Sequence, residues 1–153
     1  QKGGKDAWKE HALEFLRASN YAGIAFGHAG CAAVHAMAYP LGGVHHIPHG
    51  QANQLMFADV MRKYQQKKPV GKINQLEKLL AAELGTQPVF ALIALYELMA
   101  DVLKKAPLRA HGVTEDELPA FAKSVIETQQ RLLGNNYVEL TEEDLLNIYQ
   151  KAF

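Results

Sequence analysis

Hydrophobic residues recur at helical spacing through almost the whole chain. The pattern predicts amphipathic helices, each with one apolar face, over residues 5–17, 50–64, 72–84, 88–103, 118–133 and 141–152. No segment alternates between apolar and polar residues as a half-buried strand would. The pattern therefore predicts an all-α fold, with six or seven helices in a single domain over residues 1–153.

One further segment, residues 21–38, is apolar on nearly every side and rich in Gly and Ala. Glycine is a poor helix former, so a helix here needs a compensating gain. We expect this helix to be central and buried, with Gly27 and Gly30 at sites of close helix approach. Pro40, Gly42, Gly43 and Pro48 follow and predict an irregular loop.

Several helix ends carry recognisable capping residues. Gly85 is suited to the C-terminal end of one helix. Thr114 with Glu117 forms a capping-box pattern, which requires Pro119 to lie in the first turn or at a kink. Thr141 precedes two acidic residues and is suited to start the last helix.

Composition narrows the partners and the compartment. The 153 residues are 48% hydrophobic and 21% charged, and 16 basic residues balance 16 acidic ones. Such a chain offers no electrostatic attraction to nucleic acid or to an anionic membrane. Cys31 is the only cysteine, which rules out an internal disulfide and favours a cytoplasmic location. The apolar stretch around residues 24–37 contains His28 and His35 and is too short to span a bilayer.

Four of the seven histidines crowd into fifteen positions: His35, His45, His46 and His49. Neutral imidazole is the commonest protein ligand for catalytic divalent metals. The intervening segment is long enough to fold back, so His35 and His49 could reach one ion. A buried histidine is more often a hydrogen-bonded core residue than a ligand. The residues by themselves leave both interpretations open.

The histidines lie within a longer motif. The segment 20–53 contains Tyr-Ala-Gly-Ile-Ala-Phe-Gly from Tyr21, Val-His ending at His35, Pro-His-Gly around His49, and Ala-Asn ending at Asn53. This string resembles the second signature of the iron-containing alcohol dehydrogenases. Downstream, residues 105–109, 129–133 and 135–137 are most similar to the 4-hydroxybutyrate dehydrogenase branch of that family.

The resemblance implies a fold, a cofactor and a reaction. In that family, whose fold is like that of dehydroquinate synthase, a helical C-terminal domain holds a divalent metal, Fe²⁺ or alternatively Zn²⁺. A preceding domain binds NAD(P). His35 and His49 match two metal ligands, and hydride transfer would interconvert 4-hydroxybutyrate and succinate semialdehyde.

The same resemblance implies that part of the enzyme lies outside this sequence. The family's other ligands, an upstream Asp and His, have no match here, and neither does a nucleotide-binding motif. The chain also begins at Gln1 without an initiator methionine. We therefore expect a fragment that is inactive in isolation and comes from a homo-oligomeric enzyme acting on small alcohols and aldehydes.

The roles of the neighbouring residues remain open. Tyr39 stands where many family members carry a histidine that assists proton relay, so it is either a catalytic candidate or an aromatic residue that covers the core. His46 is a candidate for a catalytic or substrate contact, as is His45 more weakly, although exposed loop histidines would look the same. The alternative function is a non-enzymatic helical interaction module with structural histidines.

Overall fold

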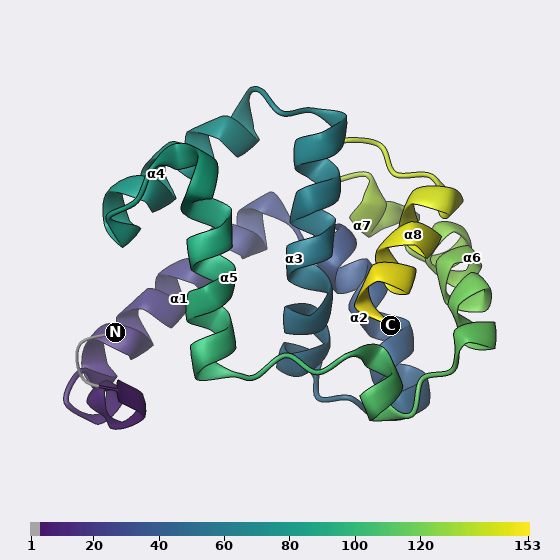
Figure 1. The fold of residues 1–153 in the computed structure, drawn as a ribbon, viewed down its shortest axis with the longest axis horizontal. Helices are drawn as coiled ribbons and strands as arrows, with labels where there is room; N and C mark the ends of the chain where they lie inside the picture. Colours follow the sequence, from purple (N-terminus) through teal and green to yellow (C-terminus); the bar gives the residue numbers. More distant parts are fainter. Residues whose placement is uncertain (1–3) are drawn as a thin grey trace.

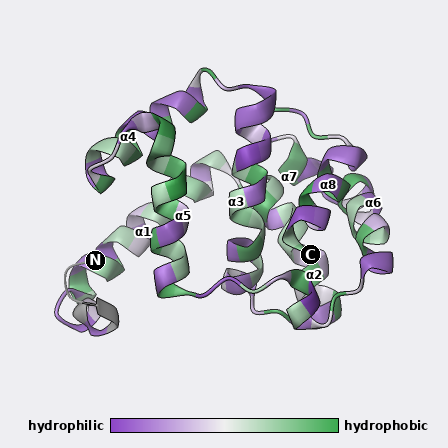
Figure 2. Ribbon diagram, viewed as in Figure 1, coloured by the Kyte–Doolittle hydropathy of each residue, from purple (hydrophilic) through white to green (hydrophobic). Residues whose placement is uncertain are grey.

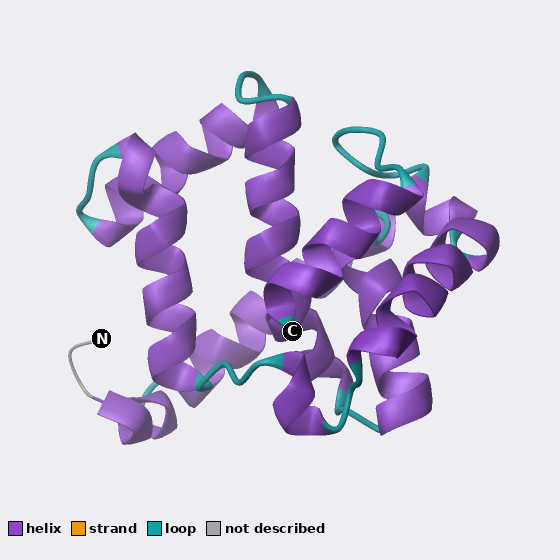
Figure 3. Cartoon of the chain, turned by 45° about the vertical axis from the view of Figure 1, so that its right-hand side comes forward, coloured by secondary structure: helices purple, strands orange, loops and turns teal. Residues whose placement is uncertain are grey.

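The described part of the chain is entirely helical. A computed structural model describes residues 4–153, and Gln1–Gly3, which open the expected domain, lie outside it. Its α-helices are α1 (Ala12–Ala29), α2 (Ala33–His45), α3 (His49–Lys67), α4 (Lys72–Leu84), α5 (Ala91–Val102), α6 (Leu118–Thr128), α7 (Gln130–Leu133) and α8 (Glu142–Ala152). Short 3₁₀ helices cover Gly4–Lys9, Pro88–Phe90, Leu108–His111 and Glu115–Glu117. Short loops join these elements (Figure 3), and the predicted all-α fold is confirmed.

Helix α3 runs through the middle of the molecule (Figure 1). Helices α2, α6, α7 and α8 gather on one side of it, while α4 and α5 lie on the other. The core lies on the first side, and its largest fully buried side chains are Met37, Leu41, Leu55, Met56, Val60, Leu108, Leu118, Val125, Leu145, Ile148 and Tyr149. Burial of each such side chain contributes roughly 1.5–3 kcal/mol to the free energy of folding. The packed cluster therefore fixes α2 and α3 relative to each other.

The glycine-rich segment is not one buried helix, and that prediction is wrong. Helix α1 ends at Ala29, and Gly30 adopts a positive φ of 77° that L-residues rarely take. A Cβ on Gly30 would lie 2.5 Å from the side chain of Asn135, whereas a Cβ on Gly27 would meet nothing within 4 Å. Of these two glycines, only Gly30 is closely approached by another part of the chain. Gly30 lies at the break between α1 and α2.

Two asparagines from the far end of the sequence hold this break. The side chain of Asn135 donates to the carbonyl of Cys31 at 3.0 Å. The side-chain oxygen of Asn136 accepts from the backbone N–H of Ala33 at 2.8 Å and from the Tyr64 hydroxyl at 2.8 Å. A free N–H at the start of α2 is thus satisfied by a residue about a hundred positions away.

The segment after Tyr39 is also more regular than predicted. Pro40 lies inside α2, which continues to His45 before a three-residue connection to α3. Proline lacks an N–H and normally weakens a helix interior. Here the buried hydroxyl of Tyr149 donates to the carbonyl of Met37 at 2.7 Å, and Leu41 is fully buried. Packing against α8 therefore stabilises the turn that Pro40 perturbs.

The predicted helix ends are largely confirmed. Gly85 ends α4 in the left-handed conformation. Thr114 and Glu117 form a capping box, and Pro119 falls in the first turn of α6. Thr141 caps α8. The expected helix over residues 118–133 is split at Gln129 into α6 and α7, which brings the number of α-helices among residues 4–153 to eight.

Helix α1 departs most from expectation. It contains no buried residue, so the predicted packing of an N-terminal apolar face does not occur within residues 4–153. Its exposed large hydrophobic residues are Leu13, Phe15, Leu16, Tyr21, Ile24 and Phe26. Figure 2 shows hydrophobic positions along both α1 and α5.

Within residues 4–153, no single helix combines the length and apolarity needed to cross a bilayer. One pair, Lys72–Leu84 with Pro88–Val102, meets those requirements by length and composition when taken together, but it is bent by 95°.

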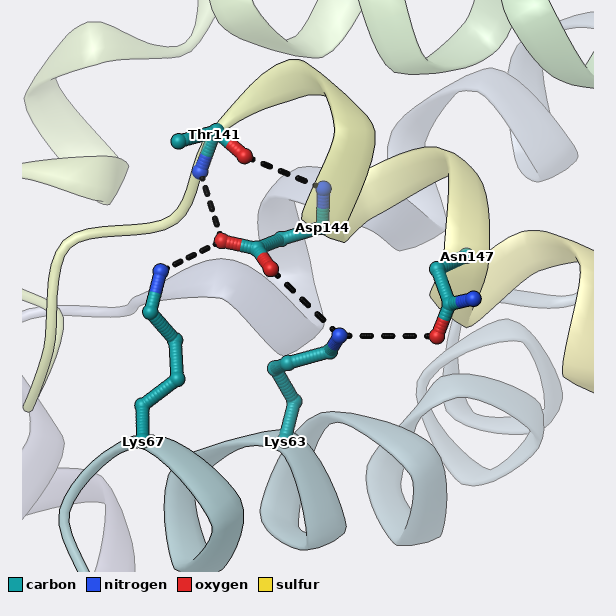
Figure 4. A network of polar contacts seen from close by, with 5 residues as sticks. All are labelled: Lys63, Lys67, Thr141, Asp144 and Asn147. Carbon is teal, nitrogen blue, oxygen red and sulfur yellow. Dashed lines mark hydrogen bonds and ion pairs between the residues drawn. The ribbon is translucent and has the colours of Figure 1, made fainter.

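A polar network ties α8 to α3 (Figure 4). The Asp144 carboxylate accepts from the Thr141 backbone N–H at 3.0 Å and pairs with Lys67 and with Lys63, the latter at 3.4 Å. Burial alone would raise the pKa of Asp144, but these hydrogen bonds outweigh it and lower the pKa from 3.8 to about 2. The charged carboxylate therefore stabilises the folded state at neutral pH.

We predict that Asp144→Asn lowers the free energy of unfolding by about 1–2 kcal/mol at pH 6, since solvent screening weakens this partly open network. Because the pKa of Asp144 is lower in the folded state, the charged carboxylate contributes its full stabilisation above the unfolded-state pKa of 3.8. This contribution to the free energy of unfolding is lost as the pH falls toward about 2. Urea unfolding between pH 2 and pH 6 should show the two proteins converging at low pH. Glu139→Gln, at an exposed position before α8, is the control, and a pH-independent difference would contradict the interpretation.

Candidate metal centre

His35 and His49 occupy the first turns of two adjacent helices. His35 is the third residue of α2 and is half-buried among core positions. His49 is the first residue of α3, with Pro48 as its N-cap at φ −53° and ψ 137°. The proline ring fixes the backbone φ just before His49, which helps to define where α3 and its first residue begin.

The structure brings these two imidazoles together. Their ring centroids lie 5.3 Å apart, and the ring planes are inclined by 51°. With metal–nitrogen distances of about 2.0–2.1 Å, two imidazoles that share one ion keep their centroids within roughly 6–7 Å. The observed separation is compatible with a shared divalent ion.

The protonation of His35 also suits metal binding. Partial burial, followed by the proximity of His49, lowers the pKa of His35 below its ordinary value of 6.5. His35 is therefore neutral at pH 7, with one ring nitrogen carrying a lone pair. Neutral nitrogen donors fit Fe²⁺ or Zn²⁺.

Two further side chains surround His49. The ring of Tyr39 stacks on the ring of His49, with centroids 6.3 Å apart and planes inclined by 25°. The side-chain Nδ2 of Asn53, one turn along α3, lies 3.0 Å from His49 Nε2. Tyr39 thus lies beside the histidine pair and is 43% exposed.

His45 is engaged elsewhere. It is the last residue of α2, and its Nε2 lies 3.0 Å and 3.1 Å from the two carboxylate oxygens of Glu117. Hydrogen bonds from the backbone and then the hydroxyl of Thr114, together with that from His45, lower the pKa of Glu117. His45 therefore anchors the end of α2 and is neither an exposed loop residue nor a free substrate contact.

His46 follows as an exposed residue in the left-handed conformation, with φ 54° and ψ 27°. It reverses the chain between α2 and α3, and no contact shown by the structure joins it to the histidine pair. His28, which precedes His35 in the same apolar stretch of the sequence, lies on α1 before the break at Gly30 and is exposed.

Two contacts at the site were not anticipated from the sequence. Asn53 appeared there only as part of the family motif, although its spacing of four from His49 places both on one helix face. Glu117 was identified only as a capping residue.

Among residues 4–153, no group of three or more His, Cys, Asp or Glu side chains is arranged to hold a metal. The described residues therefore provide a half-site made of two histidines.

Relatives of known activity match nearly the whole chain. The 4-hydroxybutyrate dehydrogenase of Clostridium kluyveri is 47% identical over 150 residues, which cover 98% of this chain and 40% of that protein. The lactaldehyde reductase of Escherichia coli K12 is 31% identical over 156 residues, covering 99% of this chain and 39% of that enzyme. The chain thus spans about two fifths of the length of these relatives.

The fold agrees with the sequence matches. The crystal structure of a 1,3-propanediol oxidoreductase superposes with a TM-score of 0.68 at 28% identity, covering 80% of this chain and 32% of that one. The family model for the C-terminal part of the Fe-containing alcohol dehydrogenases matches residues 2–153. Taken with the paired histidines on α2 and α3, these matches show that the chain belongs to the Fe-containing alcohol dehydrogenase family, of which it represents the C-terminal region.

Proposed function

We propose that residues 1–153 form the helical metal-binding domain of an NAD(P)-linked alcohol dehydrogenase that interconverts 4-hydroxybutyrate and succinate semialdehyde. The observation that carries the metal site is the convergence of His35 and His49 at 5.3 Å. The substrate is supported by the 47% identity to a 4-hydroxybutyrate dehydrogenase. Family membership favours this enzyme over a non-enzymatic helical module.

In this proposal His35 and His49 hold a divalent metal, Fe²⁺ or alternatively Zn²⁺. When bound, the metal supplies Lewis acidity to a substrate oxygen. Tyr39 lies against His49 and is the candidate for a polar contact to the reacting group. With His45 paired to Glu117, the exposed His46 is the remaining local candidate to contact a substrate carboxylate.

The nicotinamide cofactor is bound mainly by a preceding part of the enzyme in this proposal. Two features of the fold support such a part. The apolar side chains of α1 are uncovered, and a cavity of about 340 Å³ lies between α3 and α5. The cavity is lined by Gln54 and Tyr96, whose side-chain oxygens are buried without a hydrogen-bond partner. Both surfaces have the character of packing interfaces.

The lone cysteine favours a cytoplasmic enzyme, and we expect the complete enzyme to be a homo-oligomer.

We predict that His35→Ala or His49→Ala in the complete enzyme lowers metal affinity by at least about 100-fold, because loss of a ligand should exceed the effect of losing a supporting residue. Turnover should fall in parallel while the melting temperature changes little. Metal content and activity are measured across added Fe²⁺ and Zn²⁺, with His28→Ala as the control. Full occupancy and normal turnover in either variant would refute the ligand assignment.

We also predict that the 153-residue chain alone has no alcohol dehydrogenase activity, since the described residues bring only two histidines together at the proposed site and hold no metal-binding group of three or more side chains. The assay combines purified chain with Fe²⁺, NAD(P)H and succinate semialdehyde. Turnover above a blank that contains only the metal would contradict the proposed division between two domains.

The exposed face of α1 gives an independent test of the proposal that a second domain of the enzyme packs against this one. Leu16 is 67% exposed in this chain, so Leu16→Asp should leave the stability of the isolated chain nearly unchanged. In the complete enzyme the same substitution should cost at least roughly 1.5–3 kcal/mol, because the burial of the leucine is lost and a carboxylate is buried in its place. Leu55→Ala, at a fully packed position of α3, should destabilise both proteins. Equal effects of Leu16→Asp in both would show that α1 remains uncovered.

A further inference from the structure

A second cavity lies at the opposite end of α3 from the histidine pair. Its volume is about 610 Å³, and small-molecule sites usually have volumes of about 300–1,000 Å³. The end of α3, the start of α4 and the segment 135–137 before α8 form its walls. Because a helix rises about 1.5 Å per residue, Lys68 in this cavity lies roughly 28 Å along α3 from His49. The cavity is therefore separate from the candidate metal centre.

The walls of this cavity carry positive charge. Lys68 and Lys72 line it, and no aspartate or glutamate does. Other lysines of α3 are neutralised, since Lys63 and Lys67 both pair with Asp144. Within residues 4–153, no carboxylate forms an ion pair with Lys68 or Lys72. The described residues thus leave two cationic groups at the cavity without a counter-charge.

An aromatic ring holds Lys68 at the cavity. Its Nζ lies 5.1 Å from the centroid of the Tyr137 ring, in a cation–π contact. The hydroxyl of Tyr137 donates to the carbonyl of Val70, and a Cβ on Gly71 would lie 3.0 Å from that hydroxyl. The ring is therefore packed closely against the turn before α4. Since a cation–π contact neutralises no charge, the ammonium group remains able to bind an anion.

The same cavity is lined by a residue with an unpaired hydrogen-bond donor. Asn136 Oδ1 accepts from the backbone N–H of Ala33 and from the Tyr64 hydroxyl, each at 2.8 Å. A backbone N–H can only donate, so the amide must keep its oxygen toward Ala33. Asn136 Nδ2 is then a buried donor that has no partner among the described residues. Unpaired buried donors are rare in folded proteins, so this amide favours an acceptor as the ligand of the cavity.

The start of α4 selects the kind of anion. Gly71 is the N-cap and provides no side-chain cap, and the first turn contains no acidic residue. The free N–H groups of that turn add to the positive field of the lysines. Lysine ammonium groups and helix N-termini commonly bind phosphate, whereas carboxylates are more often held by the planar fork of arginine. This combination favours a phosphate group.

We propose that this cavity binds the phosphate group of a small phosphorylated compound. Lys68 and Lys72 supply the positive charge, and the Asn136 amide donates to a phosphate oxygen. The Tyr64 and Tyr137 side chains give the carbon part of the ligand an aromatic wall. This binding activity goes beyond the proposed dehydrogenase reaction and does not require the histidine pair.

The first test locates the ligand on the complete enzyme. A chelator keeps the protein free of metal, so that phosphate cannot bind an ion at the histidines. Lysines are acetylated with limiting reagent with and without phenyl phosphate, and peptide mass spectrometry measures the rate at each position. We expect protection of Lys68 and Lys72, whereas Lys78, exposed on α4 and outside the cavity, should react equally in both samples. Unchanged rates at Lys68 and Lys72 would overturn the proposal.

The second test measures the concentration of phenyl phosphate that half-protects Lys68. Lys72→Gln should raise it by roughly 10-fold, the effect of losing one charge-assisted hydrogen bond, while the matched control Lys78→Gln should not change it. Benzoate presents the same ring with a carboxylate and should protect much more weakly. Equal values in Lys72→Gln and the unmodified enzyme would contradict the site, and equal protection by benzoate would contradict its preference for phosphate.

The third test concerns the amide donor. Asn136→Asp keeps an acceptor for the Ala33 N–H but replaces the donor with a negatively charged oxygen. It should abolish the protection of Lys68 by phenyl phosphate, and the melting temperature checks that the variant is folded. Undiminished protection in the folded variant would show that Asn136 does not bind the phosphate group.

Discussion

The fold-back of the chain between α2 and α3 is the constraint on which the site depends. His35 lies near the start of α2, about ten residues before its end, yet its ring is 5.3 Å from that of His49 at the start of α3. Only three residues, His46 to Pro48, connect the helices, and they can span at most about 10 Å. The connection must therefore run back along α2 toward the turn that contains His35 and Tyr39.

Local geometry shows how this reversal is made. His46 adopts the left-handed conformation, and both its N–H and that of Ile47, at 3.4 Å, are directed to the carbonyl of Leu41. This is the hydrogen-bonding pattern of a tight helix ending. A Cβ on Gly42 would lie 3.5 Å from the Ile47 carbonyl, an ordinary van der Waals distance, which shows that the connection lies directly against α2. Ile47 is 5% exposed, and its burial adds to the free energy that holds the reversal in place.

Helix α2 is held by partners from distant parts of the chain. Asn136 accepts from its first N–H, the Tyr149 hydroxyl contacts the carbonyl of Met37, and Glu117 contacts His45 at its end. Helices α6 and α8 contribute their packing to the same core. The position of His35 thus depends on the C-terminal third of the chain. By contrast, α1 packs on little within residues 4–153, consistent with the proposal that a further part of the enzyme covers it.

The sequence by itself determined the all-helical class, most helix ends and the two histidines of interest, because helical periodicity, capping chemistry and a long motif are local properties. It could not place the break at Gly30, the helical turn through Pro40 or the Glu117 partner of His45. Each of these depends on free energy from residues about 70 to 110 positions away, such as Asn135 and Tyr149. The convergence of His35 and His49 is likewise a tertiary property. A spacing of fourteen residues permits many separations, and only the packing of α2 against α3 selects one.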